Sequence, residues 1–272
     1  MTDFSVLRVS TDGPVGTVTL HRPEARNAMN AAFFEELPQA MYHLDAEDAV
    51  RVVVIEGAGP AFTAGLDLKQ MAPAVLKGGE GSPVEQRKEL YALIQHLQEA
   101  FRAVEQCRKP VIAKINGPCI GGGVDLVTAC DIRLAASDAV FSVRETKLAM
   151  VADLGTLQRI QRVLPQGHVA ELVYTGADID AARAADIGLV NHVYPDAEAL
   201  QEATHEMAQT IAANSPLAVQ GAKHVLRKSR DQSVEDGLDY VALWNTAFLR
   251  SEDLHEAMQA FRERRTPEFD GT

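Results

Sequence analysis

Three acidic residues follow a run of glycines in the middle of the chain. The triple glycine at 121–123 comes directly after an apolar segment, and Asp125, Glu145 and Asp153 follow it. Backbone without a Cβ atom can approach a ligand closely, and the free N–H groups at the start of a helix attract negative charge. Backbone donors beside carboxyl groups suit proton transfer next to a carbonyl that becomes an oxyanion. The residue types therefore predict acid–base chemistry here.

Each acid, taken alone, also has a simpler structural explanation. Asp125 can stabilise a helix dipole, Asp153 can be the N-cap of the next helix, and Glu145 can be a surface acid beside Arg144 and Lys147. A match to one short pattern does not decide between these explanations. The combination of all three acids with the glycines, and with a second motif, favours a functional site.

The second motif is FTAGLDL at 62–68, which follows the strand-like segment VRVVVIEG. Together with GGGVDLVTACDIR at 121–133, this motif resembles the crotonase, or enoyl-CoA hydratase/isomerase, superfamily, and most closely its Δ3,5-Δ2,4-dienoyl-CoA isomerase branch. The resemblance extends over most of the chain, from LHRPEARNAMN at 20–30 to the helix-rich end. It implies an enzyme whose acyl substrate is held as a CoA thioester.

The resemblance also implies an oxyanion hole, formed by the backbone N–H groups of Leu66 and Gly122. Such a pair stabilises the enolate that forms when a proton leaves the carbon next to the thioester. Arg26 matches the region that the family uses around CoA, although a solvated surface charge explains it equally well. The expected substrate and CoA contacts are Arg26, Ala64, Asp67, Gly123 and Lys223, with Arg227 a weaker candidate on the same late helix as Lys223.

The acids separate the branches of this superfamily. A hydratase resembles this stretch but needs glutamates at positions 125 and 145, and its pattern has no acid at 153. Asp125, Glu145 and Asp153 together resemble the dienoyl isomerase pattern. We expect Glu145 to remove a proton from C2 and Asp153 to deliver one to C6, with the opposite assignment open. Asp125 is expected to orient the site or to modulate the ionisation of the pair.

Three alternatives to a dienoyl-CoA isomerase remain at this stage. An enoyl-CoA hydratase would add water to a 2-enoyl-CoA and would not need Asp153. A catalytically silent acyl-CoA-binding relative would keep the Leu66 and Gly122 donors without turnover. A structural helical oligomerisation protein would bind no acyl-CoA, and its three acids would be incidental.

Alternating strands and helices predict an α/β core around these residues. The segments 4–10 and 15–20 indicate a hairpin, and KPVIAKI at 109–115 indicates a strand that leads to the triple glycine. Helical apolar spacing covers 31–44, with Pro38 expected to interrupt or kink it, and about 84–107. The Gly- and Pro-rich stretch 71–86 predicts a mobile loop near the site.

The pattern becomes mostly helical towards the end of the chain. We therefore expect an α/β core with the acyl-CoA site at 1–200 and a helical oligomerisation region at 201–272. The resemblance implies a spiral of β-β-α units with C-terminal helices that assemble a homotrimer or hexamer. Apolar residues in 238–249 cover more than one helix stripe, which fits either a subunit contact or burial in the chain's own core.

Composition excludes several classes of partner. The formal net charge of −12 argues against nucleic acid and anionic membranes. Three cysteines without metal spacing indicate buried free thiols, no metal is expected, and no cofactor is implied because CoA is part of the substrate. The first residues do not show a basic start followed by an apolar core, no run is long enough to span a bilayer, and the last residues, FDGT, are not a peroxisomal SKL-type address. A cytoplasmic protein without membrane insertion is therefore expected.

Overall fold

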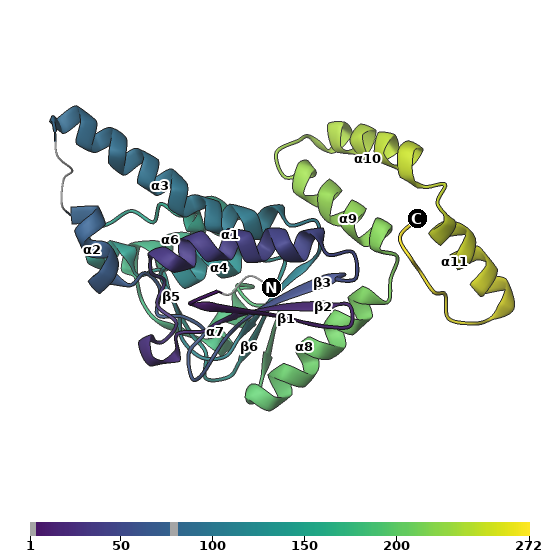
Figure 1. Cartoon of the computed structure of the whole chain (residues 1–272), viewed down its shortest axis with the longest axis horizontal. Helices are drawn as coiled ribbons and strands as arrows, with labels where there is room; N and C mark the ends of the chain where they lie inside the picture. The colour runs from purple at the N-terminus through teal and green to yellow at the C-terminus, as the bar shows by residue number, and fades with distance from the viewer. Residues whose placement is uncertain (1–3, 77–80) are drawn as a thin grey trace.

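A six-stranded sheet forms the centre of the computed structural model, which describes residues 4–76 and 81–272 (Figure 1). Its strand order is β1-β2-β3-β4-β6-β9. The bounds are β1 Leu7–Asp12, β2 Val15–Leu20, β3 Val52–Gly57, β4 Val111–Ile115, β6 Ile132–Ala136 and β9 His192–Tyr194. The first pair is antiparallel and the remaining pairs are parallel. The α/β class expected from the sequence is confirmed.

The predicted hairpin is the edge of this sheet. Its register runs from Leu7 opposite Leu20 to Asp12 opposite Val15. Gly13 turns the chain with φ of +53°, a left-handed conformation that glycine adopts without steric cost.

A β-β-α pattern repeats through the middle of the chain, as the resemblance implied. Strand β4 lies in the large sheet, and β5 (Cys119–Ile120) lies in a small second sheet before helix α4 (Gly122–Ala129). Strand β6 likewise lies in the large sheet, and β7 (Val140–Ser142) lies in the small one. Strand β8 (Ile179–Asp180) completes the small sheet. The repeat returns the chain to the same edge of the fold, where the triple glycine lies.

Helices cover both faces of the large sheet. In β3, Val53 and Ile55 belong to one apolar cluster, whereas Val52 and Val54 belong to another, as the two-residue period of a strand requires. Helices α1 (Ala31–Ala46) and α3 (Pro83–Gln106) pack in the first cluster. Helix α8 (Ala197–Ala212) packs in the second. A sheet covered on both sides accounts for the nearly continuous apolar sequence of β3.

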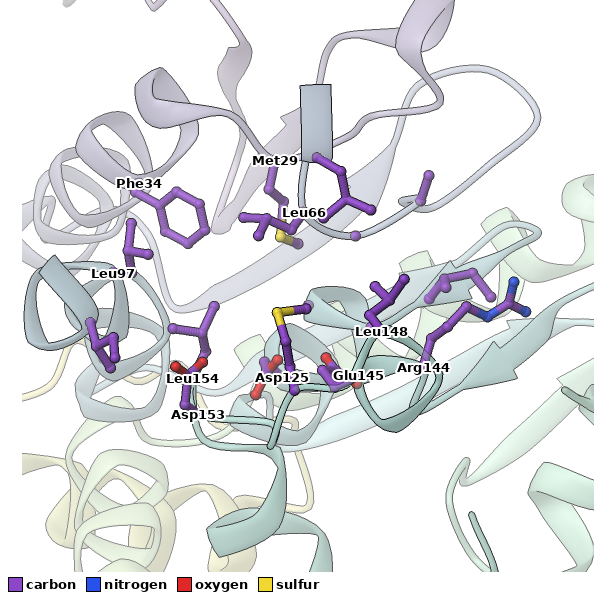
Figure 2. Close-up of a pocket in the computed structure, with 18 of the residues that line it drawn as sticks. Met29, Phe34, Leu66, Leu97, Asp125, Arg144, Glu145, Leu148, Asp153 and Leu154 are labelled. Atoms are coloured by element: carbon purple, nitrogen blue, oxygen red, sulfur yellow. The ribbon is translucent and has the colours of Figure 1, made fainter. Parts of the chain in front are cut away.

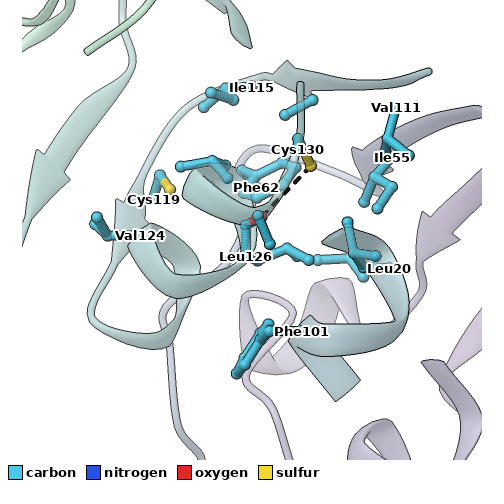
Figure 3. Packing of buried hydrophobic residues seen from close by; sticks show 14 of the residues in the cluster. Leu20, Ile55, Phe62, Phe101, Val111, Ile115, Cys119, Val124, Leu126 and Cys130 are labelled. Atoms are coloured by element: carbon cyan, nitrogen blue, oxygen red, sulfur yellow. Dashed lines mark hydrogen bonds between the residues drawn. The ribbon is translucent and has the colours of Figure 1, made fainter. Parts of the chain in front are cut away.

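Figure 3 shows the first cluster around α4. Phe62, Phe101 and Leu126 are fully buried there, and the Cys130 thiol donates a hydrogen bond of 3.4 Å to the Leu126 carbonyl. All three cysteines are free and buried, which confirms that expectation. Burial raises the pKa of Cys130 to about 12, so this thiol stays protonated and packs as a small apolar group.

Two local expectations are wrong. Helix α1 continues through Pro38, because tertiary packing of its buried face outweighs the loss of one backbone hydrogen bond. The stretch expected to be a mobile loop is largely helical: α2 spans Leu68–Leu76, and α3 begins after Ser82, whose side chain forms a capping box with Glu85. Residues 77–80 of that stretch lie outside the described residues.

The last three helices extend away from the sheet (Figure 1). They are α9 (Pro216–Ser229), α10 (Val234–Phe248) and α11 (Glu252–Glu263). The boundary expected near residue 200 falls inside α8. The assignment of acyl-CoA binding to residues 1–200 and of oligomerisation to residues 201–272 stays a prediction. None of the helices in the described part of the chain is long and apolar enough to cross a membrane.

Shorter elements complete the path of the chain. They are η1 Pro23–Ala25, η2 Glu145–Leu148, α5 Thr156–Arg159, η3 Ile160–Arg162, α6 Gln166–Thr175 and α7 Ala181–Asp186.

Candidate active site

A cavity of about 610 Å³ lies beside the start of α4 and is lined by residues from five separate parts of the chain. Figure 2 shows Asp153, Asp125 and Glu145 in a row along one wall, with Met29 and Leu66 across from them. Phe34, Leu97 and Leu154 lie at the Asp153 end, whereas Arg144 and Leu148 lie at the Glu145 end. All three predicted catalytic acids therefore share one cavity.

The backbone around Leu66 aims one N–H group into this cavity. The segment pairs with Met29 as a short parallel bridge: Met29 N–H donates to the Gly65 carbonyl, and Asp67 N–H donates to the Met29 carbonyl, both at 2.8 Å. Successive N–H groups of an extended chain point to opposite sides, so the Leu66 N–H points away from Met29. Among the described residues it has no hydrogen-bond acceptor, so it is available to a ligand.

The second donor, the Gly122 N–H, lies close to the first. Gly121 N–H donates to the Ser142 carbonyl at 2.8 Å, which fixes the turn, and Gly122 begins α4, where backbone N–H groups have no acceptor within the helix. A Cβ atom on Gly65 would lie 2.5 Å from the Ile120 carbonyl oxygen and 3.3 Å from the Gly122 nitrogen. Only glycine at position 65 lets the two segments approach this closely.

Asp125 is the deepest acid of the wall. It is 1% exposed, and its Oδ1 accepts a hydrogen bond of 2.5 Å from the Thr156 N–H. Burial, with a smaller contribution from the charge of Glu145, raises the pKa of Asp125 to about 7 despite that hydrogen bond. The carboxyl group thus holds the N-terminus of α5 as well as lining the cavity.

Glu145 lies against the glycine turn. Its Oε1 would be 3.4 Å from a Cβ atom on Gly121, the residue before the Gly122 donor. Its Oε2 is buried and has no hydrogen-bond partner among the described residues. Burial raises the pKa of Glu145, and the charge of Asp153 raises it further. A buried carboxyl oxygen without a partner, facing a cavity, is available to a substrate.

Asp153 is not the helix N-cap that the simpler explanation offered, because α5 begins after Gly155. Its backbone carbonyl accepts a hydrogen bond of 2.6 Å from the Gln98 side chain of α3. Loss of hydration inside the cavity raises its pKa, although the residue is more exposed than Asp125 or Glu145. The pKa values of Glu145 and Asp153, at the two ends of the acidic wall, are therefore both raised above those of solvated carboxyl groups.

Four of the expected CoA contacts do not line this cavity. Gly123 packs inward, where a Cβ atom would lie 2.7 Å from the Thr63 Cγ2. The Asp67 carboxylate forms an ion pair of 3.0 Å with Arg22, and Lys223 forms one of 2.6 Å with Asp131. Arg227, on α9 with Lys223, donates to the Glu105 carbonyl. In the single chain these groups pack or pair within the fold, and their roles as CoA contacts stay predictions. Arg26 and Ala64 do line the cavity.

Several lining residues were missed by the sequence analysis. Met29 faces the glycine turn, since a Cβ atom on Gly122 would lie 3.1 Å from its sulfur. Arg144 lines the cavity and also pairs with Asp178. Leu93 and Leu97 of α3 form part of an apolar end. The helical spacing of α3 could have identified its apolar face, but not which part of that face meets the cavity.

The chain belongs to the enoyl-CoA hydratase/isomerase family, whose model matches residues 10–272. A crystal structure of an enoyl-CoA hydratase from Bacillus anthracis superposes with a TM-score of 0.89 and 34% identity, covering 98% of this chain and 100% of that one. Family membership and the crotonase fold implied by the sequence motifs are both confirmed.

Two curated relatives refine this placement. A mitochondrial Delta(3,5)-Delta(2,4)-dienoyl-CoA isomerase from Dictyostelium discoideum is 43% identical, with 99% of this chain and 92% of that protein aligned. A peroxisomal enzyme of the same name from Arabidopsis thaliana is 44% identical, with 98% of this chain and 96% of that protein aligned. The expected cytoplasmic location is wrong by this comparison, because these relatives are mitochondrial or peroxisomal. Local residue patterns at the chain ends were insufficient evidence for a compartment.

Proposed function

We propose that this protein isomerises 3,5-dienoyl-CoA to 2,4-dienoyl-CoA by moving a proton from C2 to C6. The observation that carries the proposal is the third acid. Asp153 shares one cavity with Asp125 and Glu145, whereas the two-acid hydratase pattern has no acid at position 153. The two dienoyl-CoA isomerases that align over nearly the whole chain support the same reaction.

The thioester carbonyl would bind between the Leu66 and Gly122 N–H groups. Both donors are fixed by neighbouring backbone hydrogen bonds, so they need no rearrangement when charge develops on the oxygen. Glu145 lies beside this turn, next to the position that C2 of the acyl group would occupy. Arg26 and Ala64 would lie along the CoA portion.

The proton shift uses the two ends of the acidic wall. The Glu145 carboxylate takes a proton from C2, and the electron pair delocalises over the oxygen, C2, C4 and C6. The Asp153 carboxylic acid then donates a proton to C6, which leaves double bonds at C2 and C4. The reaction needs one ionised and one protonated acid, a state that mutual repulsion and burial favour. The assignment of Glu145 to C2 follows its place beside the glycine turn.

The proposal includes no separate cofactor, since CoA is part of the substrate. It also includes a homotrimer or hexamer assembled through the C-terminal helices. No residue of α10 is buried in the single chain, and Leu243 is 69% exposed. Apolar side chains left in water on this scale favour coverage by another subunit over the alternative of burial in the chain's own core.

A direct assay separates an isomerase from a hydratase. The purified protein is given a 3,5-dienoyl-CoA, and the absorbance of the conjugated 2,4-diene is followed, while hydration of a 2-enoyl-CoA is measured in parallel. We expect fast diene formation. Fast hydration without diene formation would reject the isomerase in favour of a hydratase, and binding of both thioesters without turnover would indicate a silent acyl-CoA-binding protein.

A further inference from the structure

A second cavity, of about 280 Å³, lies away from the acyl-CoA cavity and shares no lining residue with it. We call it the arginine pocket, because four arginines line it against one acid: Arg133, Arg159, Arg162 and Arg230, with Asp131. They come from β6, α5, η3 and the end of α9. Such a concentration of positive charge is unexpected in a chain whose formal net charge is −12.

Arg133 is the buried member of the pocket. It is only 8% exposed, and its Nε and Nη1 donate to the carbonyls of Leu189 and Cys130 at 2.7 and 3.0 Å. Its Nη2 makes no hydrogen bond to the described residues, and none of their carboxylates pairs with it within 4.0 Å. A buried guanidinium without a contacting anion is costly, so the pocket offers a charge that a ligand would satisfy.

The carboxylates around the pocket are already engaged. Glu105 is shared by Arg159 and Arg230, at 3.0 and 3.1 Å. Asp231 pairs with Arg162 at 2.7 Å, and Asp131 pairs with Lys223 at 2.6 Å. The cations of this cluster are Arg133, Arg159, Arg162, Lys223 and Arg230, and its carboxylates are Glu105, Asp131 and Asp231. Five cations and three carboxylates leave an excess of two positive charges.

We propose that the arginine pocket binds a small anion of the phosphate class, either free phosphate or a phosphomonoester. A dianion matches the excess of two charges. The planar guanidinium fork bonds two oxygens of a phosphate at once, and several arginines around one cavity suit its tetrahedral oxygens. The cavity has room for a phosphate group with a short organic substituent. This site is independent of the proposed acyl-CoA reaction.

The test is calorimetric titration of the whole protein at fixed ionic strength, with inorganic phosphate in one arm and glycerol 3-phosphate in the other. Acetate serves as the singly charged comparison. We expect saturable binding of at least one phosphate compound and none of acetate. Tight binding of inorganic phosphate alone would identify a free ion, whereas tighter binding of the ester would identify a phosphorylated metabolite. No saturable binding in either arm would overturn the proposal.

A matched pair of variants locates the site. Arg162→Gln and Asp231→Asn break the same ion pair, but only the first removes a cation. Arg162→Gln is expected to weaken phosphate binding by about tenfold or more, because a charge-assisted hydrogen bond is lost. Asp231→Asn should keep or strengthen it. Equal affinity of Arg162→Gln and wild type, or equal losses in the two variants, would overturn the assignment. Both positions are substantially exposed, so folding is expected to survive.

Discussion

The Asp125 carboxylate accepts a hydrogen bond of 2.5 Å from the backbone N–H of Thr156. This contact joins α4, which begins with the Gly122 donor, to α5, which follows Asp153. Asp125, in the middle of the wall, therefore anchors the chain just after Asp153. Asp125 was expected either to orient the site or to modulate the ionisation of its neighbours, and its contacts are compatible with both roles.

Asp125→Asn tests the burial of this acid through the pH dependence of stability. The folded-state pKa is raised from 3.8 to about 7, so the folded protein holds a proton that the unfolded chain has lost in this window. The stability contributed by neutral Asp125 is complete below about pH 4 and lost as the pH rises through about 7. Asparagine stays neutral and can still accept from Thr156.

The free energy of unfolding of Asp125→Asn should therefore improve relative to wild type between pH 4 and 7, and the difference should stay constant above that range. Urea unfolding at a series of pH values measures it. Turnover of this variant should fall less than turnover of Glu145→Gln or Asp153→Asn. A stability difference that does not change with pH would mean that Asp125 is ionised in the folded protein.

Deuterium exchange at C2 separates the roles of Glu145 and Asp153. Asp153→Asn should abolish diene formation while leaving thioester binding nearly intact, because the amide has a similar shape but cannot exchange a proton. Exchange of the C2 proton in D2O should continue, since Glu145 remains. Glu145→Gln should lose both reactions. Mass spectrometry of recovered dienoyl-CoA measures the exchange.

The charge of Asp153 raises the pKa of Glu145, so the pH midpoint of C2 exchange should also shift downward in Asp153→Asn. The reverse pattern, with C2 exchange lost in Asp153→Asn and kept in Glu145→Gln, would assign Asp153 to C2 and Glu145 to C6. Full diene formation by Asp153→Asn would remove this acid from the mechanism and favour the hydratase.

Gly122→Pro tests the oxyanion hole by removing one backbone donor. Proline is tolerated at the first position of a helix, and kcat should fall by roughly 10²–10³-fold. Gly122→Ala is the matched control: it places the same Cβ atom against the flexible Met29 side chain, 3.1 Å from its sulfur, but keeps the N–H. Folding is checked by circular dichroism. Equal activity of the two variants would exclude the Gly122 N–H from catalysis.

Leu243→Glu tests the proposed assembly. Trp244, in the same apolar segment, is a poorer choice, because its ring stacks on His224 at 4.7 Å and so holds α9 against α10 within one chain. Leu243 is 69% exposed, and a charge buried there in a subunit contact should raise the dissociation constant on the order of 100-fold. Sedimentation measures the state, with Tyr174→Glu on α6, 79% exposed, as control. A monomeric wild type at micromolar concentration would reject assembly.

The sequence by itself determined the local chemistry. Glycine at positions 65, 121 and 122 can be recognised from residue type alone, and so can the order of Asp125, Glu145 and Asp153. Strand alternation and turn residues predicted the hairpin, because those preferences act over a few neighbouring residues. The two long motifs then identified the family, and they contain both donors and the first of the acids, Asp125.

Only the tertiary structure decided which groups meet. The Leu66 and Gly122 donors come together through the bridges Met29–Leu66 and Thr63–Cys119, which residue spacing does not specify. Lys223 bears the charge expected of a phosphate contact, yet the fold pairs it with Asp131. Charge and residue type are local properties, whereas burial and partners depend on segments far apart in the chain. The arginine pocket, assembled from four such segments, was for the same reason invisible in the sequence.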